Sequence, residues 1–456
     1  MTTIDVLVRV ASLAGSSYLT WTWMDDAIPR AHRLDHDRVT RALDRLADAL
    51  VTDDEDGPKG RQLAELLRAG AFSAPASELA LSADLSDALL PPDLVGRIRD
   101  LTSTGWRVRF RVTPTRHFAR VPWELLVVDP RTGRRLIEDA TVVLDPPTTV
   151  HVERSRHPAS WSSVAGRAPV YVVDPELPRA AHLAGMLPAL ADPDDRVAFE
   201  DRIDDRRRIA GGELPGTWAP VQGLVHREDL GRALRAGPSR LFYFGHVSAN
   251  VEAPGSAALH LSDEVAAHPG SLRGTVGLAE PLGPRRRPGP PRRIRQGDHL
   301  PLCALDLVLG TTTAAHGPGA GTVGALLWPM PPRVALIACE GGVDYRSSEP
   351  FGLVMAMLDA GAGMVTSTRW VLPTDEGMRS GGGLGGDERP VIAAALAVDE
   401  AHEADDPVAW IRRWQIEKLE AWRVRGRLSD SPLVWATLAT TVADARTSTA
   451  VSRVTA

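Results

Sequence analysis

The sequence predicts an α/β protein whose mainly parallel central sheet is flanked by helices, preceded by a smaller α+β region. Short apolar runs alternate with helical patterns between residues 170 and 368, an order typical of strands joined by crossover helices. The runs span roughly four to six residues and are continuously apolar, as strands buried on both faces of a sheet are. Two of these runs end directly in chemically reactive residues, His246 and Cys339.

The bulk composition excludes several classes of protein. A chain of 456 residues is long enough for two or three domains. The net charge of -6 gives no reason to expect a nucleic acid or an anionic membrane as a partner. No apolar run reaches the length of a membrane span, and no signal peptide is apparent at the N-terminus. The two cysteines fit a reducing compartment, so we expect a cytoplasmic protein.

The first half of the chain changes character near residue 100. Residues 1–100 combine an apolar stretch at 6–23 with helical patterns at 39–50, 60–70 and 93–102, and we expect an accessory region of helices and strands. Residues 101–160 are rich in strand signals, and a Pro- and Ser-containing linker follows. The strands expected there are 106–112, 123–128 and 140–144.

Residues 161–445 have the strand and helix rhythm of the α/β part. We expect the stretch 192–208, acidic and then basic, to be a solvated surface. An arginine-rich segment near 280–298 contains many prolines and glycines and is predicted to be a disordered insertion, and 446–456 a tail. The expected strands are 170–173, 241–244, 334–337 and 364–367, and the expected helices are 179–191, 229–236, 348–361 and the stretch around 411–422.

His246 and Cys339 form the strongest candidate site. Each follows an apolar strand directly, and small residues surround both positions. Reactive groups of parallel sheets gather at the carboxyl ends of the strands, so two such ends can bring an imidazole beside a thiol. That pairing is what thiol-based nucleophilic catalysis requires. The alternative is that the two residues are unrelated, since cysteine is among the most buried residue types.

Other candidate sites are weaker. Cys303 lies in an apolar segment and is expected to pack as a small hydrophobe. The spacing of metal ligands is absent, so we expect no metal and no cofactor. Residues 319–324 match G-x-G-x-x-G only formally, because no clear strand precedes them, and they are interpreted as a loop. Neither a P-loop nor a G-x-S-x-G motif occurs.

Several motifs together resemble the CHAT-domain family, bacterial caspase-like proteins of the caspase–separase–gingipain group. Phe-Tyr-Phe-Gly-His at 242–246 is similar to the family's strand that ends in the catalytic histidine. Val-Ala-Leu-Ile-Ala-Cys-Glu-Gly-Gly at 334–342 is similar to its strand that ends in Ala-Cys-Glu. The resemblance covers roughly residues 100–440, and the supporting segments are 121–126, 258–263, 349–363, 366–375 and 431–435.

The resemblance implies a caspase-like sandwich and a cysteine endopeptidase that cleaves a specific protein partner. It implies Cys339 as nucleophile, His246 as its acid–base partner, and the backbone N–H groups of Cys339 and Val247 as donors to the oxyanion. It places the P1 pocket partly at 366–370. Asp375 would then favour a basic P1 residue and Arg369, beside Trp370, an acidic one, and the sequence leaves both open.

Two features leave an alternative to the peptidase. The segment between His246 and Cys339 is long and contains the arginine-rich insertion, and the residue after the histidine departs from the family pattern. The family usually has glycine after the histidine, and Val247 stands there, with a branched side chain that could crowd a substrate carbonyl. The alternative is therefore an inactive pseudo-protease that serves as an interaction scaffold. The repeat arrays fused to many relatives are absent, so a sensor or activator would be a separate protein. By the same resemblance, the peptidase would stay latent until activated in a bacterial stress or defence pathway.

Overall fold

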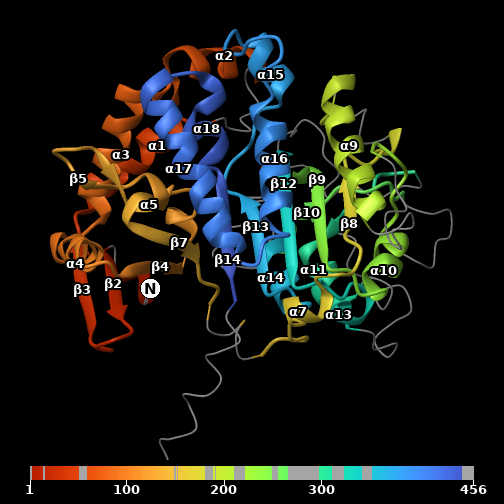
Figure 1. Ribbon diagram of the computed structural model, residues 1–456, viewed down its shortest axis with the longest axis horizontal. Helices are drawn as coiled ribbons and strands as arrows, with labels where there is room; N and C mark the ends of the chain where they lie inside the picture. The colour runs from red at the N-terminus through yellow and green to blue at the C-terminus, as the bar shows by residue number, and fades with distance from the viewer. Residues whose placement is uncertain are drawn as a thin grey trace, which may run out of the picture. The chain divides into compact units, whose positions relative to one another are not determined.

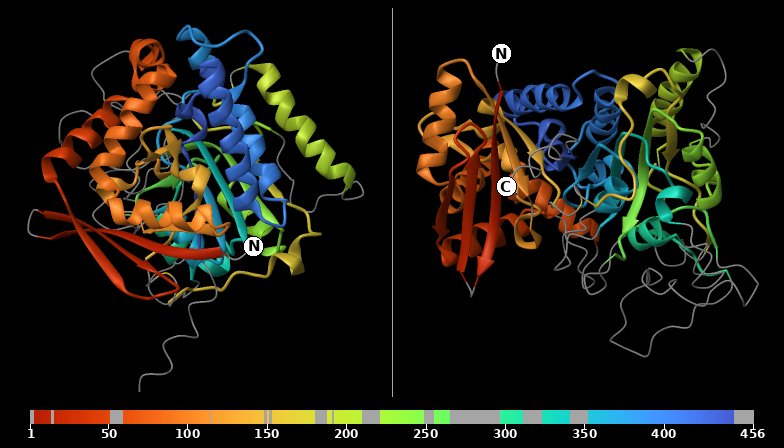
Figure 2. Two further views of the ribbon diagram at one scale, coloured as in Figure 1. Left: turned by 60° about the vertical axis from the view of Figure 1, so that its left-hand side comes forward. Right: turned by 90° about the horizontal axis from the view of Figure 1, so that it is seen from below.

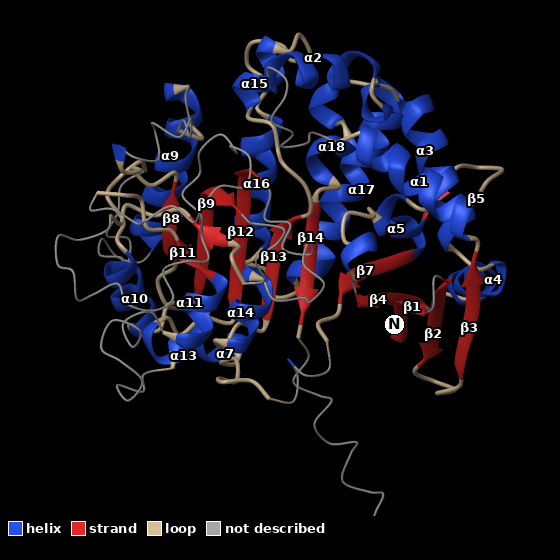
Figure 3. Cartoon of the chain, turned by 180° about the vertical axis from the view of Figure 1, so that it is seen from behind, coloured by secondary structure: helices blue, strands red, loops and turns tan. Residues whose placement is uncertain are grey.

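The computed structural model describes residues 3–13, 16–50, 59–113, 115–147, 150, 153–179, 188–190, 192–209, 221–248, 255–264, 297–310, 323–340 and 352–443. The chain forms two compact units. Unit 1 combines Met1–Asp145 with Arg369–Thr441, and unit 2 combines Pro146–Thr368 with Val442–Ala456. Each unit contains a mainly parallel sheet with helices packed around it (Figures 1 and 3).

The sheet of unit 1 has the strand order β14-β7-β4-β1-β2-β3. Its first four strands are parallel, and β2 and β3 complete it as an antiparallel meander (Figure 2, red). Val6, Val8 and Val10 of β1 are buried, whereas Leu7 and Arg9 between them are more exposed, so one face of this strand packs into the core. The strands are β1 (Thr3–Leu13), β2 (Ser16–Trp23), β3 (Pro29–Leu34), β4 (Arg107–Thr113), β7 (Ala140–Leu144) and β14 (Leu438–Val442).

The helices of unit 1 come from both ends of the chain. From the N-terminal part come α1 (His36–Asp48), α2 (Lys59–Ala69), α3 (Pro75–Leu89), α4 (Pro92–Ser103) and α5 (Leu136–Asp139). From the C-terminal part come α15 (Asp375–Ser380), α16 (Pro390–Ala401), α17 (Pro407–Arg425) and α18 (Pro432–Trp435). The short strands β5 (Val127–Asp129) and β6 (Arg134–Arg135) form a separate ribbon, and η1 (Ala71–Ser73), η2 (Arg116–Phe118), η3 (Trp123–Leu125) and η5 (Leu428–Asp430) are single turns.

The sheet of unit 2 is built around β9 (Arg240–Ser248). One edge of β9 pairs in parallel with β12 (Arg333–Glu340), which pairs in parallel with β13 (Met364–Thr368). The other edge pairs first with β8 (Val170–Val173), in parallel, and then with β10 (Ala258–Leu259), antiparallel. The strand β11 (Leu302–Cys303) follows β10. The helices are α7 (Trp161–Val164), α9 (Pro193–Ile209), α10 (Arg227–Arg235), α11 (Ala304–Leu309), α13 (Gly324–Leu327) and α14 (Leu353–Asp359).

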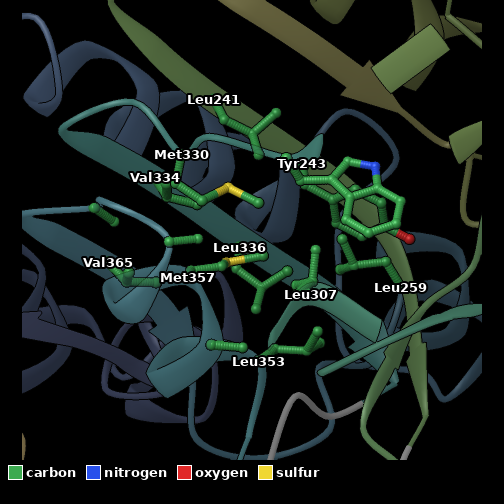
Figure 4. Packing of buried hydrophobic residues seen from close by; sticks show 14 of the residues in the cluster. Leu241, Tyr243, Leu259, Leu307, Met330, Val334, Leu336, Leu353, Met357 and Val365 are labelled. Atoms are coloured by element: carbon green, nitrogen blue, oxygen red, sulfur yellow. The ribbon is translucent and has the colours of Figure 1, made fainter. Parts of the chain in front are cut away.

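The two faces of β9 meet different layers. Leu241 and Tyr243 belong to the apolar cluster that also contains Leu307 of α11 and Met357 of α14 (Figure 4). On the opposite face, the rings of Phe242 and Phe244 contact Phe199 of α9, with centroids 6.0 and 4.9 Å apart. Because β9 is covered on both faces, its apolar residues do not alternate with polar ones. This agrees with the prediction of strands buried on both faces of a parallel sheet.

Most of the predicted elements are confirmed, and two predictions are wrong. The stretch 192–208 is not merely a solvated surface, because it forms α9 and buries Phe199 and Ile203. The predicted strand 123–128 is the turn η3 followed by the short strand β5. The predicted helix 348–361 is described only from α14 onward, and most of 179–191, most of 280–298, 319–322 and 446–456 lie outside the described residues.

Among the residues that the structure describes, no helix is both long and apolar enough to cross a membrane.

Candidate active site

His246 lies near the end of β9, where the strand leaves β8 and begins to pair with β10. It follows Phe242 and Phe244 on the face that α9 covers, because alternate side chains of a strand point to the same side. Its side chain is buried, with 7% of its surface exposed. The backbone of His246 is held firmly, since its carbonyl accepts hydrogen bonds from the N–H of His260 (3.1 Å) and the hydroxyl of Tyr243 (2.6 Å).

Cys339 lies in the neighbouring parallel strand, β12. Ala338 pairs with Gly245 and Glu340 pairs with His246, so the register shifts by one residue between them. Cys339 is the extra residue of this bulge. Its backbone therefore runs beside the Gly245–His246 peptide. Bulges re-aim the chain and are frequent next to active sites.

The side chain of Val247 points away from His246. Val247 is 1% exposed and belongs to the apolar cluster on the face of α10, α11 and α14. This packing therefore does not support the expectation that the branched side chain of Val247 crowds a substrate on the His246 face. The carbonyl of His246 is directed toward β10, so the N–H of Val247, in the same trans peptide, is directed toward β12.

Three further polar side chains form a hydrogen-bonded chain at this end of the sheet. The Oγ of Ser248 is 2.7 Å from Nε2 of His260, and Nδ1 of His260 is 2.9 Å from Nε2 of His299. The Nδ1 of His299 is 3.1 Å from the carbonyl oxygen of Asp263. Burial, with the neighbouring His299 and His246, holds the pKa of His260 well below its usual range. His260 is therefore neutral at neutral pH.

Cys303 has the surroundings of a structural thiol. It is 3% exposed, and its Sγ accepts a hydrogen bond from the N–H of Asp306 at the start of α11. Burial, together with the charge of Asp306, raises the pKa of this thiol to about 12. The thiolate is the nucleophilic form, so Cys303 is inert at neutral pH. Its burial agrees with the prediction that it packs as a small hydrophobe.

The predicted substrate-binding residues Arg369, Trp370 and Asp375 belong to unit 1, and all three side chains are buried there. The guanidinium of Arg369 donates to both carboxylate oxygens of Glu124, at 2.5 and 2.6 Å. Glu124 lies in the segment 121–126, so this ion pair gives that segment a structural role.

Trp370 and Asp375 have comparable structural partners. The indole N–H of Trp370 donates to the carbonyl of Leu433, at 2.9 Å. The carboxylate of Asp375 accepts the backbone N–H groups of Val391 and Ile392 at the start of α16, at 2.9 and 3.1 Å. These contacts favour structural roles for all three residues over substrate binding.

Sequence reasoning missed Tyr243, Ser248, His260 and His299 as site residues. Tyr243 reads as one more apolar residue of a buried strand. His299 follows the arginine-rich segment, and nothing in its local sequence indicates contact with His260. In the part of the chain that is described, no group of three or more His, Cys, Asp or Glu side chains could hold a metal ion.

Comparisons with known proteins give little further information. No protein family model and no curated protein matches this chain. Among solved structures, the separase–securin complex of Saccharomyces cerevisiae is similar to it at 8% sequence identity, with a TM-score of 0.45. The alignment covers 97% of this chain but only 30% of the length of that chain. A likeness at this score supports no assignment of function or of residues, so the site rests on its own geometry.

Proposed function

We propose that this chain is a cysteine endopeptidase of the caspase-like type, with Cys339 as nucleophile and His246 as acid–base partner. The observation that supports it most is the register of β9 against β12. Two parallel neighbouring strands carry His246 and Cys339 at adjacent positions, although 92 residues separate them in the sequence. A dyad assembled from two strand ends needs this adjacency.

In the proposed reaction, His246 takes the proton of the Cys339 thiol, and the thiolate attacks the carbonyl carbon of a peptide bond. The carbonyl oxygen becomes an oxyanion. When the tetrahedral intermediate collapses, the C–N bond breaks and the imidazolium of His246 gives its proton to the leaving amine. Water then hydrolyses the thioester, with His246 as general base, and releases the thiol.

The oxyanion is assigned to the N–H groups of Val247 and Cys339. The N–H of Val247 is directed toward β12, where His246 pairs with Glu340 in the parallel ladder, so it can serve the oxyanion only if substrate binding releases it from that pairing. Losing one such donor typically costs about 3–4 kcal/mol of transition-state stabilisation. A specific protein would be the substrate, and the enzyme would stay latent until a separate sensor or activator protein switches it on.

The alternative function, an inactive scaffold with the same fold, rested on the side chain of Val247 and on the long segment between His246 and Cys339. The side chain of Val247 packs into the core on the face opposite His246, so it does not support inactivity by crowding that face. We therefore place the peptidase first.

The test compares the reactivity of the two cysteines of the chain, Cys339 and Cys303. A peptidyl acyloxymethyl ketone is added to the full chain at pH 7, and the labelled residue is identified by mass spectrometry. We expect labelling of Cys339 only, because the Cys303 thiol does not ionise. His246→Ala should slow labelling and peptide cleavage by about 10²–10⁴-fold.

The matched variants decide between the two functions. Cys303→Ala should retain labelling and cleavage, whereas Cys339→Ala should lose both. Cleavage that survives Cys339→Ala, or equal labelling in wild type and His246→Ala, would contradict the dyad and leave the scaffold as the better assignment.

A further inference from the structure

We propose that His260 is a positioning residue for His246: its ring, fixed between Ser248 and His299, stays neutral and leaves the proton of the site to His246. This inference rests on the proposed peptidase activity and deepens it. It starts from the backbone, because the N–H of His260 donates to the carbonyl of His246 at 3.1 Å. The hydroxyl of Tyr243 bonds to the carbonyls of both histidines, at 2.6 and 3.0 Å.

The side chains of His246, Ser248 and His260 share one face of the sheet. Leu259 pairs with Val247 in the antiparallel register, and both side chains lie in the apolar cluster on the opposite face. Because side chains alternate, His260 and His246 face the same way from adjacent positions on neighbouring strands. Side chains in such cross-strand pairs have Cβ atoms about 4.5–5.5 Å apart, and like charges there are unfavourable.

The hydrogen-bonded chain allows only one order of protons when both rings are neutral. The carbonyl of Asp263 can only accept, so Nδ1 of His299 carries a hydrogen and its Nε2 accepts. Nδ1 of His260 must then donate to His299, and its Nε2 accepts from the hydroxyl of Ser248. Both ring nitrogens of His260 are thus occupied, and the ring cannot rotate without losing a bond.

The charged groups around the chain leave His260 neutral. His299 and His246 are the neighbours that lower the pKa of His260, after burial itself. Asp263 is the nearest carboxylate along the chain, and its Oδ2 accepts the backbone N–H of Arg227 at 2.8 Å. The other groups near this end of the sheet are His226, 3.9 Å from Asp263, the buried Asp298, and Glu264, whose backbone pairs with that of His299.

A neutral neighbour matters for the proposed chemistry. The dyad works as a thiolate beside an imidazolium, so His246 has to carry a positive charge. A charged His260 opposite it would disfavour that state. The arrangement also commits the one ring lone pair of His260, at Nε2, to the hydroxyl of Ser248, while its Nδ1 donates to His299.

The test measures the order of protonation. The full chain carrying Cys339→Ala is labelled with ¹⁵N in its 13 histidines, and long-range ¹H–¹⁵N spectra are recorded between pH 5 and 8. Each resonance is assigned through its His→Gln variant. We expect His260 to stay neutral with its hydrogen on Nδ1 throughout this range, and His299 to carry its hydrogen on Nδ1. In His246→Gln and in His299→Gln, His260 should become protonated at a higher pH, because each removes an imidazole that disfavours its charge.

The kinetic arm uses wild-type Cys339 and the rate of its alkylation against pH. His260→Gln and His299→Gln should slow alkylation at pH 7 by about tenfold to a hundredfold, as expected when a reacting group is misplaced. His226→Gln is the matched control, since its side chain is 46% exposed, and should behave as wild type. If His260→Gln fails to fold, the spectra of the Cys339→Ala chain still test the claim.

The outcomes separate this inference from the peptidase itself. A charged His260 at a pH where Cys339 reacts, or a pH profile unchanged in both His260→Gln and His299→Gln, would overturn the positioning role while leaving the dyad intact. Cleavage that persists in Cys339→Ala would overturn the peptidase, whatever the spectra show.

Discussion

At the scale of single residues, burial decides the protonation of one thiol and one imidazole, those of Cys303 and His260. Cys303 is inert because its thiol is buried beside Asp306, and His260 is neutral because it is buried beside two other imidazoles. Sequence reasoning predicted the first, since Cys303 lies among apolar residues. It could not predict the second, because His260 and His299 are distant in the sequence and come into contact only in the folded chain.

The first prediction concerns Cys303 and alkaline pH. In the unfolded chain its thiol ionises near pH 9, but in the folded chain it stays protonated up to about pH 12. The unfolded state therefore binds fewer protons above pH 9, and the free energy of unfolding falls as the pH rises through this window. At pH 10, urea unfolding should show a loss of about 1–2 kcal/mol from this group. Cys303→Ala should lack this component, and an identical pH dependence in both chains would contradict the assignment.

The second prediction concerns the hydroxyl of Tyr243, which bonds to two carbonyls (Figure 4 shows its position in the cluster). Tyr243→Phe leaves both acceptors with one partner fewer and should cost about 1–3 kcal/mol of stability. It should also slow the alkylation of Cys339. Tyr171→Phe, which removes a buried hydroxyl bonded to Arg240, is the control and should affect stability alone. Equal alkylation rates in wild type and Tyr243→Phe would show that the hydrogen bonds of the Tyr243 hydroxyl do not affect the reactivity of Cys339.

At the scale of elements, the sheet of unit 2 could be predicted and its covering layers only in part. The strands β8, β9 and β12 contain continuous apolar runs, and the sequence indicates them directly. The helix α9 escaped prediction because its exposed surface is densely charged, and the few apolar residues that face β9, such as Phe199, do not stand out. The helix α3 escaped because small residues, Ser82 and Ser86, occupy its buried face.

The third prediction tests why glycine precedes His246. A Cβ on Gly245 would lie 3.1 Å from the hydroxyl oxygen of Tyr243, 3.2 Å from its Cζ and 3.3 Å from Cδ of Pro175. Gly245→Ala should therefore displace the Tyr243 ring and cost about 1–3 kcal/mol in thermal or urea unfolding. Gly166→Ala in the same unit is the control, because its Cβ would meet no atom within 4 Å. Comparable stability of the two variants would mean that the ring moves without cost.

At the scale of the whole molecule, unit 1 was beyond sequence reasoning because its parts are far apart in the chain. The sequence analysis assumed continuous segments with boundaries at residues 100 and 160, whereas unit 1 combines residues 1–145 with 369–441. One of the contacts that join the two segments is the buried pair of Glu124 and Arg369, 245 residues apart. The motifs around both residues are explained by this pairing.

The fourth prediction tests that pair. Glu124→Gln leaves the guanidinium of Arg369 buried without its counter-charge and should cost about 3–5 kcal/mol of unfolding free energy. Glu376→Gln breaks the pair with Arg379, whose carboxylate side is 53% exposed, and should cost about 1 kcal/mol or less. Chemical denaturation of the two variants gives the comparison. A small effect of Glu124→Gln would indicate that water reaches Arg369.

The division of unit 1 between two distant segments has a consequence for protein synthesis. The strands β1, β2, β4 and β7 leave the ribosome before the 223 residues that precede Arg369 have been made. At about 5–20 residues per second, this delay is roughly 10–45 seconds. Unit 2 is nearly continuous and can fold during that interval, whereas the first 145 residues must wait with an unfinished core. The nascent chain is therefore most exposed to chaperones and to aggregation early in translation, well before its candidate active site exists.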